Sequence, residues 1–359
     1  MARPTFNDIA RVTGFSKNAI SLALRDSPQI SPETREKIKV AAEKLGYRPN
    51  PVVSQLMAQL RSTRTVPLQA KLALVNANHD PAAFRNHPTI PTYTEGCESR
   101  ATKLGYSFDR FWLHDAEATP ERWTRIFRAR GIKGIVLVGL MHTNHLPKGL
   151  NSIWSTFPSI VTGVRTRDPA LSFACVDHHH LVLTAFERAL QLGYKRPGLV
   201  IDDVIEALVE HRFSAGFFAG QNLRPGTERI SIFSDGPGNE RLESFRSWYE
   251  KNKPDVIFTL YNNAIKWLAS FGKRVPEDVG VIQLEWRTAH PEIAGMNQHN
   301  RAVGEAAVDM LVTQINNNET GVQEFPRATL IGATWVEGPS VRRTQAPSTA
   351  RMRRAKKKV

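Results

Sequence analysis

The sequence predicts a small all-α domain at the N-terminus, followed by an α/β core built from two doubly wound parallel-sheet lobes. Three observations predict this organisation. The chain has 359 residues, which is too long for one ordinary domain. The first 48 residues contain three short helical patterns, each with a start signal, and the first and third end at a glycine. From residue 70 onward, apolar runs alternate with amphipathic stretches, as strands alternate with helices in parallel sheets.

The N-terminal helices are predicted from their caps. Thr5 is a typical N-cap residue, and Gly14 can end the first helix because glycine adopts a left-handed conformation easily. Ser16 caps a second helix and Ser31 caps a third. Two short helices packed on a third form a helix-turn-helix domain, which we assign to residues 1–48. A three-helix bundle without a partner is the alternative.

The start of the second helix favours a nucleic-acid partner. Lys17 can donate to guanine and Asn18 can pair with adenine, and in a helix-turn-helix this end meets the major groove. Residues 1–62 hold ten Lys and Arg against five Asp and Glu. Positive charge concentrated in a small module indicates a polyanion as partner, and we therefore expect double-stranded DNA.

The first fifty residues resemble the LacI/GalR family of bacterial transcription repressors. The resemblance rests on the segments Thr5–Ala10, Gly14–Ser16, Ala19–Ser21, Ile30–Arg35 and Leu45–Asn50. Two positions depart from the family: Leu22 stands where a base-reading Arg is frequent, and Arg25 stands where Asn is usual. The resemblance implies a homodimer that binds a near-palindromic operator in the bacterial cytoplasm, associated with the nucleoid. The DNA-binding residues expected in this domain are Thr5, Ser16, Lys17, Asn18, Ser21 and Leu22.

Residues 49–62 are predicted to form a hinge helix and a linker. Asn50 between two prolines offers a helix cap, but the helix that follows is too short to be stable alone. In the family that this segment resembles, the hinge folds in the minor groove and an apolar side chain wedges between bases. The resemblance implies this role for Leu56, with Asn50 and Val53 as further DNA contacts. An ordinary linker turn is the alternative.

The core is assigned to residues 70–340. Strands are predicted at 72–75, 134–138, 159–161, 198–201, 256–260 and 279–282, and helices at about 92–104, 120–130, 181–192, 240–252, 262–271 and 301–317. The order resembles the family's core, which is similar to a periplasmic sugar-binding protein and crosses three times between its lobes. We expect the crossings near residues 163, 291 and 325. They assign 70–163 and 292–325 to an N-lobe, and 164–291 and 326–340 to a C-lobe.

The expected ligand site is the cleft at the carboxyl ends of the strands. Tyr261 and Asn262 follow one predicted strand, and Glu285 and Trp286 follow another. Gln298 matches an amide that lines the cleft in the family. Carboxylate, amide and aromatic groups suit a polyol, so we expect a carbohydrate or related effector. The alternative is that these are ordinary polar residues at strand ends.

One departure affects this site. The family often has an Arg three residues before a Gly, and here Phe213 occupies that position before Gly216. Arg212 lies one residue earlier, which rotates its side chain by roughly 100° around a helix. Arg212 is therefore kept as a displaced candidate for ligand binding.

Other functions are disfavoured. The sequence contains no catalytic or nucleotide-binding motif, and Asp177 before three histidines is interpreted as a helix cap. We therefore expect no enzyme activity, no cofactor and no metal. Cys97 and Cys175 are too few for a disulfide framework, and neither an apolar run of membrane length nor a signal peptide is present, which fits the cytoplasm. A solute-binding protein, or an activator or dual regulator, remains the alternative.

The C-terminal tail, residues 341–359, contains eight Lys and Arg and no acidic residue. Because it lacks a pattern that could form a core, we expect it to be disordered. It either adds nonspecific affinity for phosphates or is simply solvated.

Overall fold

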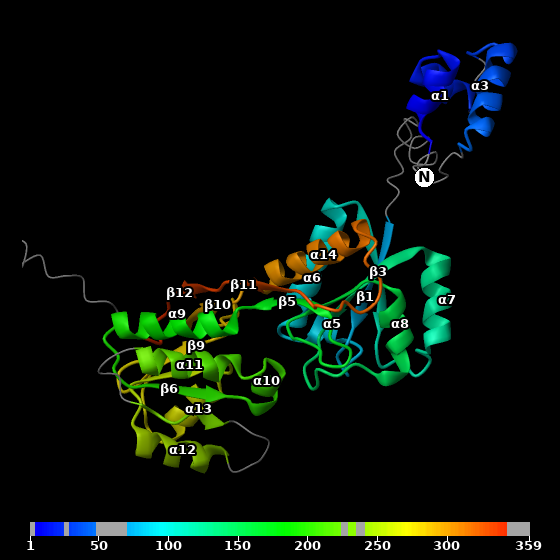
Figure 1. Cartoon of the computed structure of the whole chain (residues 1–359). Coiled ribbons are helices and arrows are strands. Elements are labelled where there is room, and N and C mark those ends of the chain that lie inside the picture. Colours follow the sequence, from blue (N-terminus) through cyan, green and yellow to red (C-terminus); the bar gives the residue numbers. More distant parts are fainter. Residues whose placement is uncertain (1–3, 25–28, 48–69, 224–228, 235–240, 343–359) are drawn as a thin grey trace, which may run out of the picture. The chain divides into compact units, whose positions relative to one another are not determined.

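The computed structural model describes residues 4–24, 29–47, 70–223, 229–234 and 241–342 (Figure 1). The chain divides into two compact units, Met1–Pro67 and Leu68–Val359. The predicted hinge and linker, and the tail after residue 342, lie outside the described residues.

The first unit contains three helices, α1 (Phe6–Thr13), α2 (Lys17–Ala23) and α3 (Pro32–Lys44). Their N-caps are Thr5, Ser16 and Ser31, which confirms the predicted starts. Gly14 ends α1 with a left-handed φ of 72°, which favours glycine. The helices surround a core of five fully or almost fully buried residues, Ile9, Ile20, Ala23, Ile38 and Ala42.

The second unit contains two six-stranded sheets. The first sheet has the order β11-β5-β4-β3-β1-β2, and all its strands are parallel. Its strands are β1 (Ala70–Asn76), β2 (Tyr106–Trp112), β3 (Ile132–Val138), β4 (Ser159–Thr162), β5 (Ser172–Val176) and β11 (Ala328–Ile331). We call this sheet with its helices the first lobe.

The second sheet has the order β12-β10-β9-β8-β6-β7 and belongs to the second lobe. Its strands are β6 (Pro197–Ile201), β7 (Phe233–Ser234), β8 (Val256–Thr259), β9 (Gly280–Gln283), β10 (Ala294–Asn297) and β12 (Thr334–Val336). Only β12 runs antiparallel to its neighbour. The strands of both sheets follow the same order along the chain, and the sheets differ only in the direction of the last strand, so the two lobes have equivalent doubly wound topologies.

Helices cover the sheets (Figure 1). The first lobe carries α5 (Ala83–Asn86), α6 (Ile90–Lys103), α7 (Pro120–Arg130), η1 (Lys148–Leu150), α8 (Asn151–Thr156) and α14 (Asn300–Asn316). The second lobe carries α9 (His178–Gln191), α10 (Asp203–Leu208), α11 (Arg212–Leu223), α12 (Arg241–Asn252) and α13 (Asn263–Ser270). The six predicted helices and the six predicted strands are confirmed, with ends displaced by at most a few residues.

The first crossing between the lobes lies later than expected. β5 pairs in parallel with β4, and all its residues are buried, so the first lobe keeps the chain through Val176. The boundary expected near residue 163 was wrong because the segment 172–176 is needed to complete the first sheet. The chain crosses at Asp177, which caps α9 by accepting from the backbone of His180.

The other two crossings are displaced in the same direction. β10 pairs with β9, so the second lobe holds the chain through Asn297 rather than only to residue 291. β11 pairs with β5 and therefore belongs to the first lobe, which places the third crossing after Ile331 rather than near residue 325. The core also continues past residue 340, because the backbone N–H of Arg342 donates to the hydroxyl of Tyr194 at 2.9 Å.

Helices α6 and α14 pack closely in the first lobe because glycines face the contact. A Cβ atom at Gly304 would lie 2.2 Å from the backbone oxygen of Tyr93, and one at Gly96 would lie 2.0 Å from that of Arg301. This packing fixes the N-terminal turn of α6, from which Tyr93 reaches the site described below. No helix in the described part of the chain is long and apolar enough to cross a membrane.

Candidate functional site

The first turn of α2 presents polar groups to solvent. Lys17 and Asn18 are exposed, whereas Ile20 and Ala23 on the opposite face are buried in the core of the unit. Ser16 is exposed, and its hydroxyl oxygen accepts from the backbone N–H of Ala19 at 3.2 Å. The side chain of Ser16 therefore fixes the start of the helix, while Lys17 and Asn18 are available to a partner.

The remaining candidate DNA-binding residues of this unit are less available to a partner. Ser21 and Leu22 are partly buried on α2. Thr5 is exposed, but its hydroxyl and its backbone N–H both donate to the carboxylate of Asp8, at 2.8 and 2.9 Å. These hydrogen bonds hold the pKa of Asp8 below its usual value. The hinge candidates Asn50, Val53 and Leu56 lie outside the described residues.

The second unit contains a cavity of about 330 Å³ between its lobes. Its walls include residues that follow β3, β6, β8 and β9, such as Gly139, Asp202, Tyr261 and Glu285. These are carboxyl ends of parallel strands, and β1 and β6 are the points where the strand order reverses in each sheet. Ligands of doubly wound proteins bind at this position.

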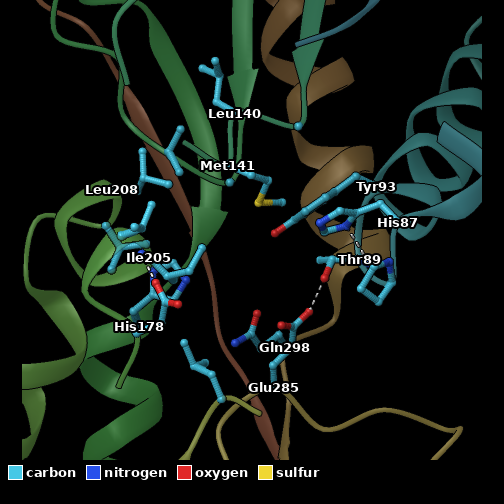
Figure 2. Close-up of a pocket in the computed structure, with 18 of the residues that line it drawn as sticks. His87, Thr89, Tyr93, Leu140, Met141, His178, Ile205, Leu208, Glu285 and Gln298 are labelled. Carbon is cyan, nitrogen blue, oxygen red and sulfur yellow. Dashed lines mark hydrogen bonds between the residues drawn. The ribbon is translucent and has the colours of Figure 1, made fainter. Parts of the chain in front are cut away.

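A polar contact between the lobes closes one side of the cavity (Figure 2). Thr89, the residue before α6, donates its hydroxyl to Glu285 at 2.7 Å. Arg287 donates to Glu285 at 2.9 Å and to the Thr89 oxygen at 3.2 Å. The Glu285 and Arg287 side chains are only 14% and 24% exposed. We call Thr89, Glu285 and Arg287 the polar bridge.

Other polar groups adjoin this bridge. The Nδ1 atom of His87 accepts from the backbone N–H groups of Thr89 and Ile90 at 3.1 and 3.3 Å. Burial lowers the pKa of His87, which keeps this acceptor unprotonated. The hydroxyl of Tyr93 also lines the cavity, and its pKa is raised because the ring is buried and lies near Glu285.

The opposite side of the cavity is largely apolar. Ile205 and Leu208 of α10, in the second lobe, pack against a hydrophobic cluster of the first lobe that includes Leu140 and Val164. We call Ile205 and Leu208 the apolar bridge. Phe213 adds an aromatic ring to this side, at the position where the resemblance led us to look for an Arg.

Three of the six predicted ligand residues line the cavity: Tyr261, Glu285 and Gln298. Gln298 is 6% exposed, and its Nε2 donates to the carbonyl of Leu284 at 2.9 Å, which fixes the orientation of its amide. Thr259 accepts from the backbone N–H of Tyr261 at 3.3 Å and thereby orders the turn after β8.

The other three predicted ligand residues are not among those that line the cavity. Asn262 accepts from Gln283 at 3.1 Å and lies before α13. Trp286 is partly buried, with its backbone N–H donating to Met296 at 2.9 Å. Arg212 does not line the cavity; its guanidinium donates to the sulfur of Cys175 at 3.1 Å. The one-residue displacement of this Arg along α11 therefore removes it from the cavity.

The lining residues that sequence reasoning missed include His87, Thr89, Tyr93, His178 and Arg287. His178 begins α9, which directly follows β5, and Thr89 and Tyr93 lie at the start of α6, which follows β1 after the short helix α5. The same rule that places ligands at the carboxyl ends of strands applies to the helices that start there, so it could have found them. In the described part of the chain, no group of three His, Cys, Asp or Glu side chains is arranged to hold a metal ion.

Comparison with known proteins gives a consistent assignment. A profile of the family "Bacterial regulatory proteins, lacI family" matches residues 5–50, and a profile of the periplasmic binding protein-like domain matches residues 186–341. The HTH-type transcriptional regulator CelR of Thermobifida fusca is 25% identical over 335 residues, covering 89% of this chain and 94% of the relative.

Two solved structures share the fold. A CelR–cellobiose complex has a TM-score of 0.56 at 20% identity and covers 94% of this chain and 100% of that one. A Lac repressor dimer bound to operator and the anti-inducer ONPF has a TM-score of 0.55 at 17% identity, covering 94% of this chain and 99% of that one. The chain therefore combines a helix-turn-helix domain of the lacI family, over residues 5–50, with a periplasmic binding protein-like domain, and it is similar over most of its length to the regulator CelR.

Proposed function

We propose that the protein is a transcription repressor that binds a near-palindromic operator as a homodimer and responds to a small molecule in the cleft of its core. The observation that carries the proposal is the match of residues 5–50 to a DNA-binding family, together with the exposed Lys17 and Asn18 on α2. Lys and Asn side chains at this end of a helix can read bases in the major groove. The protein would act in the bacterial cytoplasm, with the nucleoid.

The proposed effector is a carbohydrate or a related hydroxylated metabolite. A structural neighbour holds cellobiose, and the polar side of this cavity offers hydroxyl, carboxylate and amide groups from Thr89, Glu285 and Gln298. These groups can both donate to and accept from ligand hydroxyls.

The polar bridge supplies a mechanism for control. The hydrogen bond from Thr89 to Glu285 joins the two lobes directly. A ligand hydroxyl that takes the place of Thr89 on Glu285 would break this bond and favour another lobe arrangement. Only contacts that differ between two arrangements can shift the equilibrium between them, and we propose that the polar bridge is such a contact.

The DNA-binding proposal can be tested without knowledge of the operator. Sequences bound by the full-length protein are enriched from a random double-stranded pool, and we expect an inverted repeat, because a symmetric dimer reads two half-sites. On the enriched site, Lys17→Ala and Asn18→Ala should each cost about 1–3 kcal/mol in titrations by fluorescence anisotropy. Affinity for a scrambled sequence should change much less.

Lys37→Ala is the matched control, because Lys37 is also an exposed cation of the first unit but lies on α3 and pairs with Glu33 at 2.9 Å. It should leave the preference for the enriched site over scrambled DNA unchanged. Equal losses on the two DNAs for Lys17→Ala and Asn18→Ala would show that these residues contact only phosphates. The proposed base reading would then be wrong.

A further inference from the structure

His178 occupies an unusual position in the cleft. It is the first residue of α9, it is 6% exposed, and it lines the cavity on the side of Ile205 and Leu208 (Figure 2). Its ring lies against Phe213, with 4.7 Å between the ring centroids. Within the described part of the chain, its Nδ1 atom is buried without a hydrogen-bond partner. A buried polar atom without a partner costs free energy, so its presence beside a ligand cavity calls for a role.

The surroundings of His178 offer few other polar groups. Val209, Phe213 and Leu260 line the same cavity, together with the apolar bridge. Asp202 is a lining residue as well, but its carboxylate accepts from the backbone N–H of Ile205 at 3.0 Å and caps α10. A ligand that reaches this side therefore meets aliphatic and aromatic surface, with the imidazole of His178 inserted into it.

The imidazole of His178 is neutral. Burial, with a contribution from the positive charge of Arg212, lowers the pKa of His178 to about 3. A neutral imidazole has one N–H donor and one nitrogen acceptor, so it can hydrogen-bond an uncharged polar group in either direction. It cannot supply the positive charge that an anionic ligand would need.

The charged groups that line the described cavity are already engaged. Glu285 and Arg287 pair with each other at 2.9 Å, and Asp202 caps a helix. A ligand carrying a net charge would have to compete for one of these partners or remain without a compensating charge. An uncharged ligand faces neither cost.

We propose that His178 is a specificity-determining residue of the cleft, and that it hydrogen-bonds a polar substituent on the apolar part of an uncharged effector. This inference rests on the proposed function of the cleft as an effector site. The effector class that fits has a hydroxylated end against the polar bridge and an aromatic or aliphatic end against Phe213 and the apolar bridge, as in an aryl glycoside.

The test uses phenyl β-D-glucopyranoside and its three monohydroxyphenyl isomers, bound to the full-length protein and followed by calorimetry. At least one isomer should bind about 3–10-fold more tightly than the phenyl compound, the gain expected for one net hydrogen bond. In His178→Phe this advantage should disappear, while the affinity for the phenyl compound stays within about twofold. In His178→Asn, which keeps a polar group, part of the advantage should remain.

His180→Phe is the control, since His180 lies on the same turn of α9 but is exposed. It should retain the full preference for the hydroxylated isomer. A preference that survives in His178→Phe, the absence of any preference in the wild type, or no binding of the four compounds would each overturn the inference. So would tighter binding of the charged 4-carboxyphenyl glucoside.

Failure of this inference is distinguishable from failure of the proposed function. A different compound that releases the operator equally from wild type and from His178→Phe would support the proposed regulatory function and contradict only the role assigned to His178. Loss of operator preference is measured separately, through Lys17 and Asn18. The tryptophan fluorescence of each variant, compared with wild type, verifies that the core has folded, because all seven tryptophans lie between residues 112 and 335.

Discussion

On one side of the cleft, Thr89 of the first lobe meets Glu285 and Arg287 of the second through hydrogen bonds of 2.7–3.2 Å. On the other side, Ile205 and Leu208 of the second lobe pack among aliphatic residues of the first. Hydrogen bonds weaken steeply when their angle or length changes, whereas apolar contact depends mainly on the area removed from water. The polar bridge therefore favours one lobe arrangement, and the apolar bridge permits several.

This difference indicates how a ligand could act. A ligand that competes for Glu285 can release the directional contact while the apolar bridge keeps the lobes together. Sensitivity to the effector should then be concentrated on the polar side, and the apolar side should mainly contribute stability. The following predictions test this division, from the largest expected effect to the smallest.

The largest effect is expected for Glu285→Ala. It removes the acceptor of Thr89 and leaves the partly buried guanidinium of Arg287 without its carboxylate partner. Because an exposed ion pair contributes about 0–1 kcal/mol and breaking a fully buried pair costs 3–5 kcal/mol, we expect a loss of about 3 kcal/mol for this intermediate case. Urea unfolding followed by tryptophan fluorescence measures it, since the seven tryptophans all lie in the second unit.

Two further variants sharpen this measurement. Glu285→Gln keeps an acceptor oxygen for Thr89 and should lose less than half as much stability. Arg287→Ala, added to Glu285→Ala, should cost under about 1 kcal/mol, because the two residues act as one unit. If the stability losses of Glu285→Ala and Arg287→Ala were additive in the double variant, the two side chains would not be energetically coupled.

The second prediction concerns the packing of α6 against α14, which holds the polar side of the cleft in position. In Gly304→Ala the new Cβ would lie 2.2 Å from the backbone oxygen of Tyr93, an atom that cannot move without displacing α6. Removing a glycine from a helix gains about 1 kcal/mol, whereas overpacking costs about 1–3 kcal/mol. Because the clash is with backbone, the overpacking cost should lie at the upper end of this range, which gives a net destabilisation of about 2 kcal/mol in the same unfolding experiment. Effector binding should weaken as well, because Thr89 and Tyr93 move with α6.

Gly149→Ala is the control for this substitution, because a Cβ at Gly149 meets no atom within 4 Å. It should be neutral or slightly stabilising. If Gly304→Ala behaves like Gly149→Ala, the close approach of α6 and α14 does not determine the positions of Thr89 and Tyr93.

The third prediction uses pH. The pKa of His178 is lowered to about 3 in the folded protein, against about 6.5 in an unfolded chain. The unfolded state therefore binds more protons between these values, so stability is complete above about pH 6.5 and falls as the pH falls toward 3. From pH 7 to pH 5 this group should cost the wild type about 2 kcal/mol that His178→Phe does not lose. His180→Phe should follow the wild type, and parallel curves for all three proteins would contradict a neutral, buried His178.

The features that were predictable from sequence are those determined by neighbouring residues. The caps Thr5, Ser16 and Ser31 act within three residues of themselves, and all three begin helices in the structure. Helix α11 is absent from the predicted helix ranges, although the position of Arg212 was interpreted as helical; Gly216 and Gly220 weaken the helical pattern of this segment. Those glycines fit its contact with α9: a Cβ at Gly216 would lie 2.5 Å from the backbone oxygen of His179. Tertiary packing overrides local propensity there.

The cleft was only partly predictable, for a related reason. Glu285 and Tyr261 follow strands directly, so the rule for parallel sheets finds them. Thr89 joins the site through a contact with a residue 196 positions away, which no local pattern contains. The three crossings were misplaced because three short strands, β5, β10 and β11, were not recognised, and each of them keeps the chain in its sheet for longer than expected.

The smallest effect is expected for Ile205→Val, on the apolar side. Ile205 is partly buried and packs against hydrophobic clusters of both lobes. Loss of one methylene should cost about 0.5–1.5 kcal/mol, at the low end here because the residue borders an existing cavity. The effector concentration that releases the operator should change by less than about threefold, because apolar contacts adapt to small losses of volume.

Thr89→Val is the matched comparison, since it keeps the side-chain shape but removes the hydroxyl that joins Glu285 and Arg287. If the polar bridge controls the lobes, Thr89→Val should change this concentration by about tenfold or more, the effect of a hydrogen bond to a charged group. A larger change for Ile205→Val than for Thr89→Val would reverse the roles assigned to the two sides of the cleft.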